Sequence, residues 1–266
     1  MIVSDNDPNL ELKVLTSEFQ YPNFHYKASK CSGFENSMFA LSYGSGHLLK
    51  LHNNTMVFKD RSLINMIEFA KKNINNRATI FYSNASLGNY SEKIFTNFDG
   101  FIRELSFYSS WSNGFTIWKD DFNFNSDVDE YFPQVSLLIA QSNKKKYVVC
   151  DKQYFEMQSV KKKGSYNIFS AFCKNYLGLL KNAAADNKIQ IKTLDSIKKD
   201  MLFKFLPLNF FKTKVIKVEN YDSRGLKKII DSEYPWYAFY VVVVLGSLFF
   251  FYYFFDACRK ILKQKY

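Results

Sequence analysis

Proline and glycine are scarce in this chain of 266 residues, which holds five prolines and ten glycines. Cysteine and histidine are rarer still, at four and three residues, and no two cysteines have the close spacing of a zinc site. So few cysteines exclude a disulfide framework and favour a reducing compartment. The opening residues, MIVSDNDP, lack an apolar core, so the sequence predicts no signal peptide.

Motifs of known chemistry are missing as well. The segment Gly44-Ser45-Gly46-His47 lacks the Gly-Lys-Ser/Thr of a P-loop and the third glycine of a dinucleotide fingerprint, so it predicts a turn. The carboxylates between residues 120 and 130 indicate a solvated loop rather than an acid–base pair. The sequence therefore predicts a protein that is not an enzyme, with no catalytic residues, metal site, cofactor or small-molecule substrate.

Aromatic and basic side chains, by contrast, are abundant. The chain holds 28 Phe and 18 Tyr, and its 36 Lys and Arg against 25 Asp and Glu give a net charge of +11. Phe, Tyr, Lys, Ile and Asn use A/T-rich codons, so this composition indicates an A/T-rich genome, and we expect that of an organelle. A basic chain favours polyanionic partners, either nucleic acid or an anionic membrane.

One long apolar run lies near the C-terminal end of the chain. Residues 236–255 read WYAFYVVVVLGSLFFFYYFF, without a charge, and twenty helical residues span about 30 Å. Aromatic residues at both edges and a basic tail at 256–266 are typical of a membrane span. The run predicts a transmembrane helix with Trp236 and Phe255 at its ends. A fully buried core element is the alternative, because the β-branched residues 241–244 also suit a strand.

The rest of the chain alternates between strand and helix patterns, which predicts an α/β fold with a mostly parallel sheet flanked by helices. Strands are expected at 56–58, 78–82, 103–108 and 135–140, and helices at 62–75, 90–98 and 167–180. The run 147–150 is expected to form another strand or the start of a helix. In the first helix Leu63, Ile67, Ala70 and Ile74 recur at helical spacing, which predicts its buried face. The predicted organisation is an extended arm (1–34), an α/β body (35–182), a Lys-rich connector (183–235), the hydrophobic helix (236–255) and the basic tail (256–266).

Two lysine triplets lie in predicted loops of the body, one after the run 135–140 and one after 157–160. Loops at one end of a parallel sheet share an edge, so the two triplets can converge into one phosphate-binding patch. Two separate solvated loops are the alternative. The predicted RNA-binding residues are Lys144, Lys145, Lys146, Lys161, Lys162 and Lys163.

The order of the elements between residues 55 and 140 resembles the universal small-subunit ribosomal protein S-two family, in a divergent mitochondrial form. A strand that closes on Asp60 precedes the amphipathic helix 62–75 and the strand 78–83, as in that family. The segment 111–116 matches the family's Trp/Gly turn at Trp111 and Gly114. The resemblance extends over about residues 36–180 and implies a flavodoxin-like α/β sandwich that binds small-subunit rRNA without catalysis.

These features predict a ribosomal protein, a noncatalytic structural constituent of the small subunit of the mitochondrial ribosome. Its expected partners in this ribonucleoprotein are small-subunit rRNA, neighbouring ribosomal proteins and, through the predicted transmembrane helix, the inner membrane. The expected localisation is the ribosome of the mitochondrial matrix, where it acts in translation. The alternative is an accessory membrane subunit of a respiratory complex in the mitochondrial inner membrane, because composition, the single predicted span and the missing catalytic motifs fit it equally.

Overall fold

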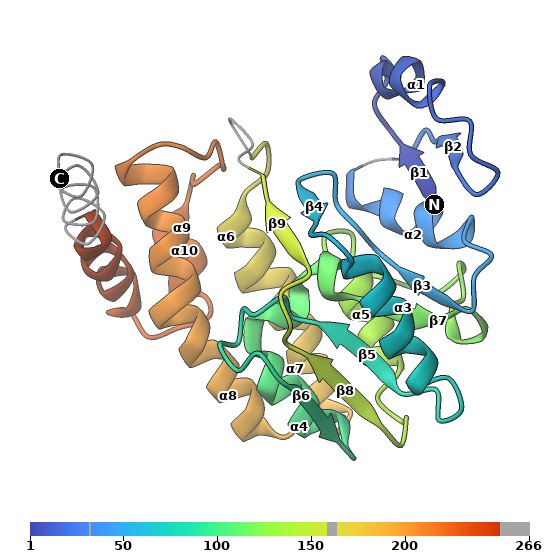
Figure 1. The fold of residues 1–266 in the computed structure, drawn as a ribbon. Helices are drawn as coiled ribbons and strands as arrows, with labels where there is room; N and C mark the ends of the chain where they lie inside the picture. The colour runs from blue at the N-terminus through green and yellow to red at the C-terminus, as the bar shows by residue number, and fades with distance from the viewer. Residues whose placement is uncertain (32, 159–163, 251–266) are drawn as a thin grey trace, which may run out of the picture. The chain divides into compact units, whose positions relative to one another are not determined.

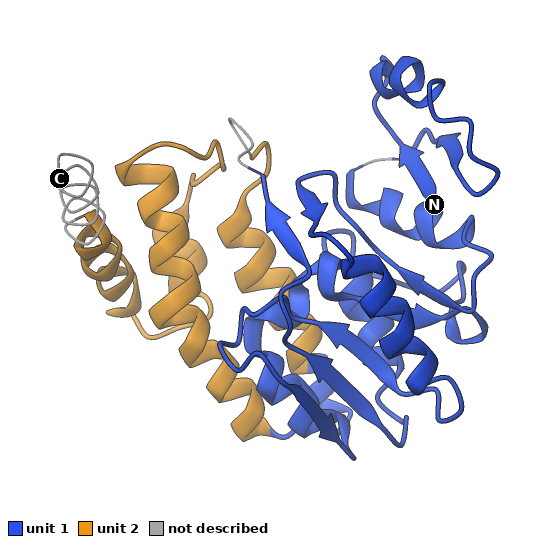
Figure 2. Cartoon of the chain, viewed as in Figure 1, with its two compact units in different colours: residues 1–158, 182–190 blue, residues 159–181, 191–266 orange. Residues whose placement is uncertain are grey.

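The computed structural model describes residues 1–31, 33–158 and 164–250. The chain divides into two compact units (Figure 2). Unit 1 consists of Met1–Gln158 with Asn182–Gln190, and unit 2 of Ser159–Lys181 with Ile191–Tyr266. All the strands named below belong to unit 1.

Unit 1 holds four small sheets (Figure 1). The pair β1–β2 is parallel, and the pairs β3–β7 and β4–β9 are antiparallel. The fourth sheet has the order β5-β8-β6, in which β8 runs parallel to β5 and antiparallel to β6. The strands are β1 (Ile2–Asp5), β2 (His25–Ala28), β3 (Leu48–Lys50), β4 (Met56–Phe58), β5 (Thr79–Tyr82), β6 (Glu92–Phe95), β7 (Thr116–Trp118), β8 (Tyr147–Cys150) and β9 (Phe155–Met157).

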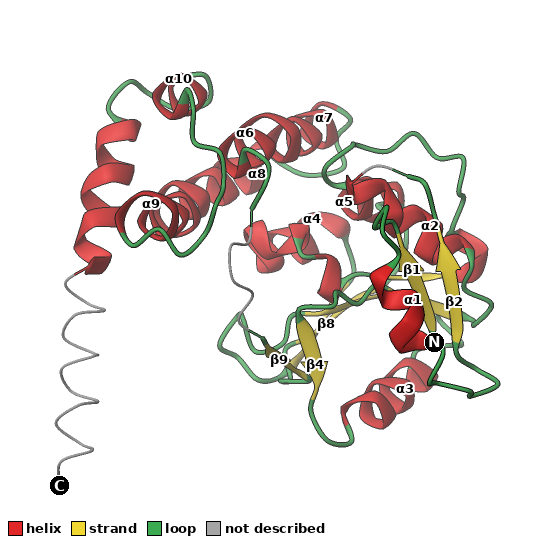
Figure 3. Ribbon diagram, turned by 90° about the horizontal axis from the view of Figure 1, so that it is seen from above, coloured by secondary structure: helices red, strands yellow, loops and turns green. Residues whose placement is uncertain are grey.

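The helices of unit 1 are short. They are α1 (Glu11–Thr16), α2 (Asn36–Ser42), α3 (Ser62–Lys72), α4 (Phe98–Leu105) and α5 (Pro133–Ala140), with 3₁₀ segments at Gly33–Glu35, Ser106–Ser110, Ser112–Gly114 and Lys119–Asp121. Figure 3 shows α3 and α4 on opposite sides of the sheet that contains β8.

Strands β5 and β8 of the three-stranded sheet are buried on both faces, and their successive side chains point to opposite faces, whereas β6 is partly exposed. Ile80, Tyr82 and Val148 belong to the apolar cluster that also contains Met66 and Phe69 of α3. On the other face the Tyr147 ring lies with its centroid 5.7 Å from that of Phe98 and 5.2 Å from that of Phe101, both in α4. Aromatic contacts of this kind add to the burial of apolar area, so this sheet is the core of unit 1.

Unit 2 is helical where the structure describes it. Its helices are α6 (Ile168–Ser170), the part of α7 (Leu177–Ala185) up to Lys181, α8 (Ile191–Asp200), α9 (Leu206–Phe210) and α10 (Leu226–Asp231), with π-helical turns at Ala171–Tyr176, Met201–Phe205 and Phe211–Val215 and a further helical segment at 238–250. Fully buried apolar side chains hold the unit together, among them Ile197, Met201, Leu206, Phe211 and Ile230.

The predicted fold class is wrong, since the sheets are small and three of the five strand pairs are antiparallel. The predicted strands at 56–58 and 78–82 are confirmed as β4 and β5, and of the two alternatives for 147–150 the structure has the strand, β8. The run 135–140, however, belongs to helix α5, which begins at Pro133. Proline favours the first turn of a helix, and an apolar run buried all round has the same pattern in a helix as in a strand.

In the segment 90–108 the order of helix and strand is the reverse of the predicted one, so both predictions there are wrong. The expected helix at 90–98 contains strand β6, and the expected strand at 103–108 lies in α4 and the 3₁₀ segment after it. The side chain of Asn97 accepts a hydrogen bond from the backbone N–H of Gly100 at 2.8 Å, so helix α4 begins directly after it.

The described part of the apolar run, residues 236–250, does not contain the predicted transmembrane helix. Over the described part of the chain, up to residue 250, we find no helix with the length and apolar character required to cross a bilayer. Trp236 is exposed and precedes the helical segment 238–250. Phe255 and the tail 256–266 lie outside the described residues.

Candidate functional site

The turn at Trp111–Gly114 brings the backbone against strand β5. A Cβ atom placed on Gly114 would lie 2.2 Å from Cε1 of Phe81 and 2.8 Å from the carbonyl oxygen of Tyr82. Trp111, half-buried, packs against the apolar cluster on the α3 face of the sheet. Glycine at position 114 is therefore required by this close approach of two backbone segments.

Asn113 connects this turn to the segment that follows β3. Its side-chain oxygen accepts a hydrogen bond from the backbone N–H of Asn53 at 2.6 Å, and its backbone oxygen accepts one from Lys50 Nζ at 2.6 Å. The hydroxyl of Ser112 donates to the side-chain oxygen of Asn53 at 3.1 Å. The turn is thus a fixed part of unit 1, held by polar contacts from residues 50–53.

Replacing Gly114 by alanine is expected to lower the free energy of unfolding by about 2 kcal/mol or more, because the new methyl group overlaps Phe81 and the Tyr82 carbonyl. Gly178 is the control, since a Cβ there meets nothing within 4 Å and the residue lies inside helix α7. Gly178→Ala should stabilise the protein by up to about 1 kcal/mol. Urea unfolding measures both, and equal effects of the two substitutions would contradict the close approach.

Of the two lysine triplets, the structure describes the first. Lys144, Lys145 and Lys146 lie between α5 and β8, and Lys144 pairs with Asp121 at 2.6 Å. Lys145 is exposed and Lys146 half-buried, and neither has an ion-pair partner among the described residues. Lys161, Lys162 and Lys163 lie outside the described residues, so the convergence of the triplets stays a prediction.

An open pocket of about 660 Å³ lies beside the first triplet. Lys144, Arg103 of α4 and Lys188 are its cationic lining residues, and Asn97, Asn143 and Asn187 contribute amide groups. Asp99 offsets part of the positive charge, because it accepts hydrogen bonds from Arg103 at 2.8 Å and from the backbone N–H of Gln190 at 2.7 Å. This surface offers several hydrogen-bond donors to an anionic group.

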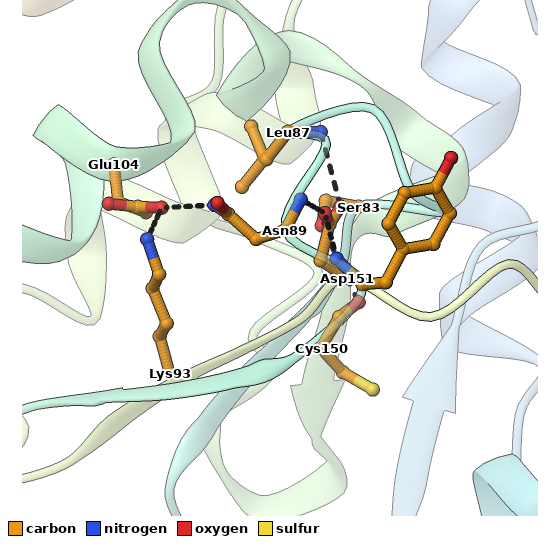
Figure 4. A network of polar contacts seen from close by, with 8 residues as sticks. Ser83, Leu87, Asn89, Lys93, Glu104, Cys150 and Asp151 are labelled. Atoms are coloured by element: carbon orange, nitrogen blue, oxygen red, sulfur yellow. Dashed lines mark hydrogen bonds and ion pairs between the residues drawn. The ribbon is translucent and has the colours of Figure 1, made fainter.

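Asp151 organises a loop that the sequence prediction did not identify (Figure 4). It follows β8 directly and is buried, and its carboxylate accepts a hydrogen bond from the hydroxyl of Ser83 at 2.6 Å. The backbone N–H groups of Leu87, Asn89 and Tyr90 donate to the same carboxylate at 3.2, 2.8 and 3.1 Å. An aspartate directly after the strand pattern 147–150 was the available signal.

The outer part of this network is an ion pair. Lys93 Nζ and the side-chain amide of Asn89 both donate to Oε1 of Glu104, at 2.5 and 3.2 Å (Figure 4). The carboxylate of Asp151 accepts hydrogen bonds from four donors, so this aspartate is suited to hold the loop.

Half-buried Lys50 and exposed His52 form a second polar group that the sequence prediction missed. Lys50 Nζ donates to the backbone oxygen of Leu51 at 2.8 Å and lies 4.6 Å from the centre of the Phe155 ring. Desolvation lowers the pKa of Lys50 to about 7. Desolvation, and then the charge of Lys50, also lower the pKa of His52, whose ring stacks on Phe58 at 4.3 Å.

No group of three or more His, Cys, Asp or Glu side chains in the described part of the chain is placed to hold a metal ion. Comparison of the sequence with models of known protein families finds no match, and comparison with curated proteins finds none either.

Proposed function

We propose that the chain is a noncatalytic structural constituent of the small subunit of the mitochondrial ribosome, and that the loop Lys144–Lys146 contacts rRNA phosphates. The observation that carries this proposal is the position of Lys145 and Lys146 in a loop, without an ion-pair partner among the described residues. Unpaired lysine ammonium groups release counterions from RNA when they bind its phosphates.

The surroundings of the loop support an anionic partner. Arg103 and Lys188 line the pocket next to Lys144, and although each of the three pairs with an aspartate, the pocket gathers cationic groups from three segments of unit 1. The chain as a whole carries a net charge of +11, which favours association with a polyanion. Contacts of this kind position a protein on folded RNA without reading its bases.

Replacing Lys145 and Lys146 together by alanine is expected to weaken binding to small-subunit rRNA. Loss of two phosphate contacts should reduce the slope of log K against log salt by about 2. Filter binding at several salt concentrations measures that slope. Lys192→Ala with Lys199→Ala is the control, because it removes the same charge from exposed positions of α8. Equal slopes for the two double variants would refute the proposed contact.

The ribosomal assignment itself is tested by sedimentation of mitochondrial extract in mild detergent, with and without ribonuclease. The chain should sediment with small-subunit rRNA and be released when the RNA is digested. If the chain instead sediments with respiratory complexes and ribonuclease does not release it, the assignment is overturned in favour of the alternative, a subunit of a respiratory complex.

A further inference from the structure

Helix α3 presents more apolar side chains than unit 1 covers. Met66 and Phe69 face the core, whereas Leu63, Ile64 and Ile67 are 53%, 58% and 46% exposed. At 100° per residue these three lie on an arc beside the buried one, and Ile74, also exposed, continues it past the end of the helix. The predicted buried face of this helix is therefore wrong at Leu63, Ile67 and Ile74, which form an uncovered apolar face.

The N-terminal arm carries a second uncovered apolar face. Helix α1 has no buried residue, and Leu12, Leu15 and Phe19 are all exposed. Their spacing of three and four residues places them on one side of the helical turn. Backbone bonds from Glu18 to Leu15 and from Phe19 to Thr16 extend the turn beyond α1, so Phe19 is held on that side.

The two faces carry opposite charge. Residues 11–19 of the arm carry Glu11 and Glu18 against Lys13, whereas the chain as a whole is strongly basic. Around α3 the balance is reversed, with Arg61, Lys71 and Lys72 against Glu68. None of these side chains has an ion-pair partner among the described residues of unit 1.

We propose that the acidic segment 11–19 in the arm of one chain docks on the basic-flanked apolar face of α3 in a second copy of the chain. Each copy has one arm and one α3 face, so a reciprocal exchange closes a twofold dimer and buries both contacts at once. Apolar burial stabilises the contact, and the opposite charges set which surfaces meet. This self-association belongs to the free chain and does not rest on the proposed ribosomal function.

Sedimentation velocity of the purified full chain over a range of concentrations tests the proposal. The chain should shift from monomer to dimer, and Leu15→Asp or Ile67→Asp should each weaken the dimer by about tenfold or more, since each places a charge in an apolar contact. Val14→Asp is the matched control, because Val14 is exposed on the opposite side of α1 and should leave the dimer unchanged.

Two further measurements separate exchange between copies from other kinds of association. Glu11→Lys with Glu18→Lys should weaken the dimer, and adding Lys71→Glu with Lys72→Glu should restore it. An equal mixture of the Leu15→Asp and Ile67→Asp variants should associate more strongly than either alone, because one arm and one face remain intact.

A chain that stays monomeric at all concentrations overturns the proposal. The proposal also fails if Leu15→Asp and Ile67→Asp leave the dimer intact. It fails as well if the substitutions at Lys71 and Lys72 do not restore the dimer that the substitutions at Glu11 and Glu18 weaken. Thermal unfolding of each variant, which should match that of the original chain at these exposed positions, confirms that folding is retained.

Discussion

Replacing Asp151 by alanine is expected to lower the free energy of unfolding by about 4 kcal/mol, the largest loss expected from a single polar side chain here. The substitution removes the acceptor of four donors, the hydroxyl of Ser83 and the backbone N–H groups of Leu87, Asn89 and Tyr90. Hydrogen bonds to an ionised acceptor contribute about 1.5–3 kcal/mol each, and partial hydration of the opened loop recovers some of that sum.

The backbone of the loop adds to this effect. Asn84, Ala85 and Tyr90 adopt positive φ angles of 54°, 61° and 52°, a backbone conformation that residues other than glycine rarely adopt. Such conformations cost free energy and persist only where surrounding contacts determine them. Without the carboxylate of Asp151, the loop is expected to leave this conformation.

Two matched variants separate the carboxylate from its neighbours. Ser83→Ala removes one of the four donors and should cost about 1 kcal/mol. Asn89→Ala keeps the backbone N–H that donates to Asp151 and should change stability by less than about 0.5 kcal/mol. Urea unfolding gives the three values, and hydrogen exchange should be faster at the amides of residues 87–90 in Asp151→Ala. If Asp151→Ala has a free energy of unfolding no lower than that of Ser83→Ala, the role given to Asp151 is contradicted.

The strands β5 and β8 could be predicted from the sequence because each is a compact apolar run with turn residues on either side. The same reasoning failed at 135–140, where burial on all sides removes the periodicity that separates a helix from a strand. It also failed for α3. There the apolar residues cover a wider arc than unit 1 buries, so helical spacing identified the helix but not which residues face the core.

The pairing of the strands depends on contacts distant in the sequence. Paired residues of β4 and β9 lie roughly 100 positions apart in the sequence, and those of β3 and β7 lie roughly 70 positions apart. Such antiparallel pairs have the same local pattern as members of a parallel sheet, so the strand pattern did not determine the topology.

The candidate site was predicted in part. Trp111 and Gly114 were expected to form a turn because of the resemblance to the ribosomal family, and the structure places Gly114 at a close approach to β5 and Trp111 against the apolar cluster. Asp151 and Lys50 were not predicted, because a lone carboxylate or lysine is exposed in most proteins, and the position of Asp151 directly after an apolar run was its one signal. Their burial depends on segments far along the chain, the loop 83–90 for Asp151 and the turn at Asn113 for Lys50.

The stability of the protein is expected to rise with pH above neutrality because of Lys50. Its ammonium has a pKa of about 7 in the folded chain, against 10.5 for an ordinary lysine, since burial removes it from water. Between these two values the unfolded chain holds a proton that the folded chain has released. Linkage then requires the free energy of unfolding to increase with pH, and below pH 7 the full cost of the buried charge remains.

From about pH 7 to pH 9 the increase should reach about 2–3 kcal/mol, since each pKa unit corresponds to about 1.4 kcal/mol. The measurement stops there because burial raises the pKa of Cys150 above its ordinary value of 9, which lowers stability at higher pH. Burial lowers the pKa of His52, so protonation of this ring changes the stability mainly below pH 6.5, outside the measured range.

Lys50→Met tests this assignment, since methionine keeps an unbranched side chain only one atom shorter and removes the charge. The variant loses the hydrogen bonds to the backbone oxygens of Leu51 and Asn113, and it also loses the desolvation cost of the ammonium. Its free energy of unfolding should therefore stay flat from about pH 7 to pH 9, whereas exposed Lys59→Met should keep the slope of the original chain. If Lys50→Met keeps the rise, another group carries it and the ammonium of Lys50 remains hydrated in the folded protein.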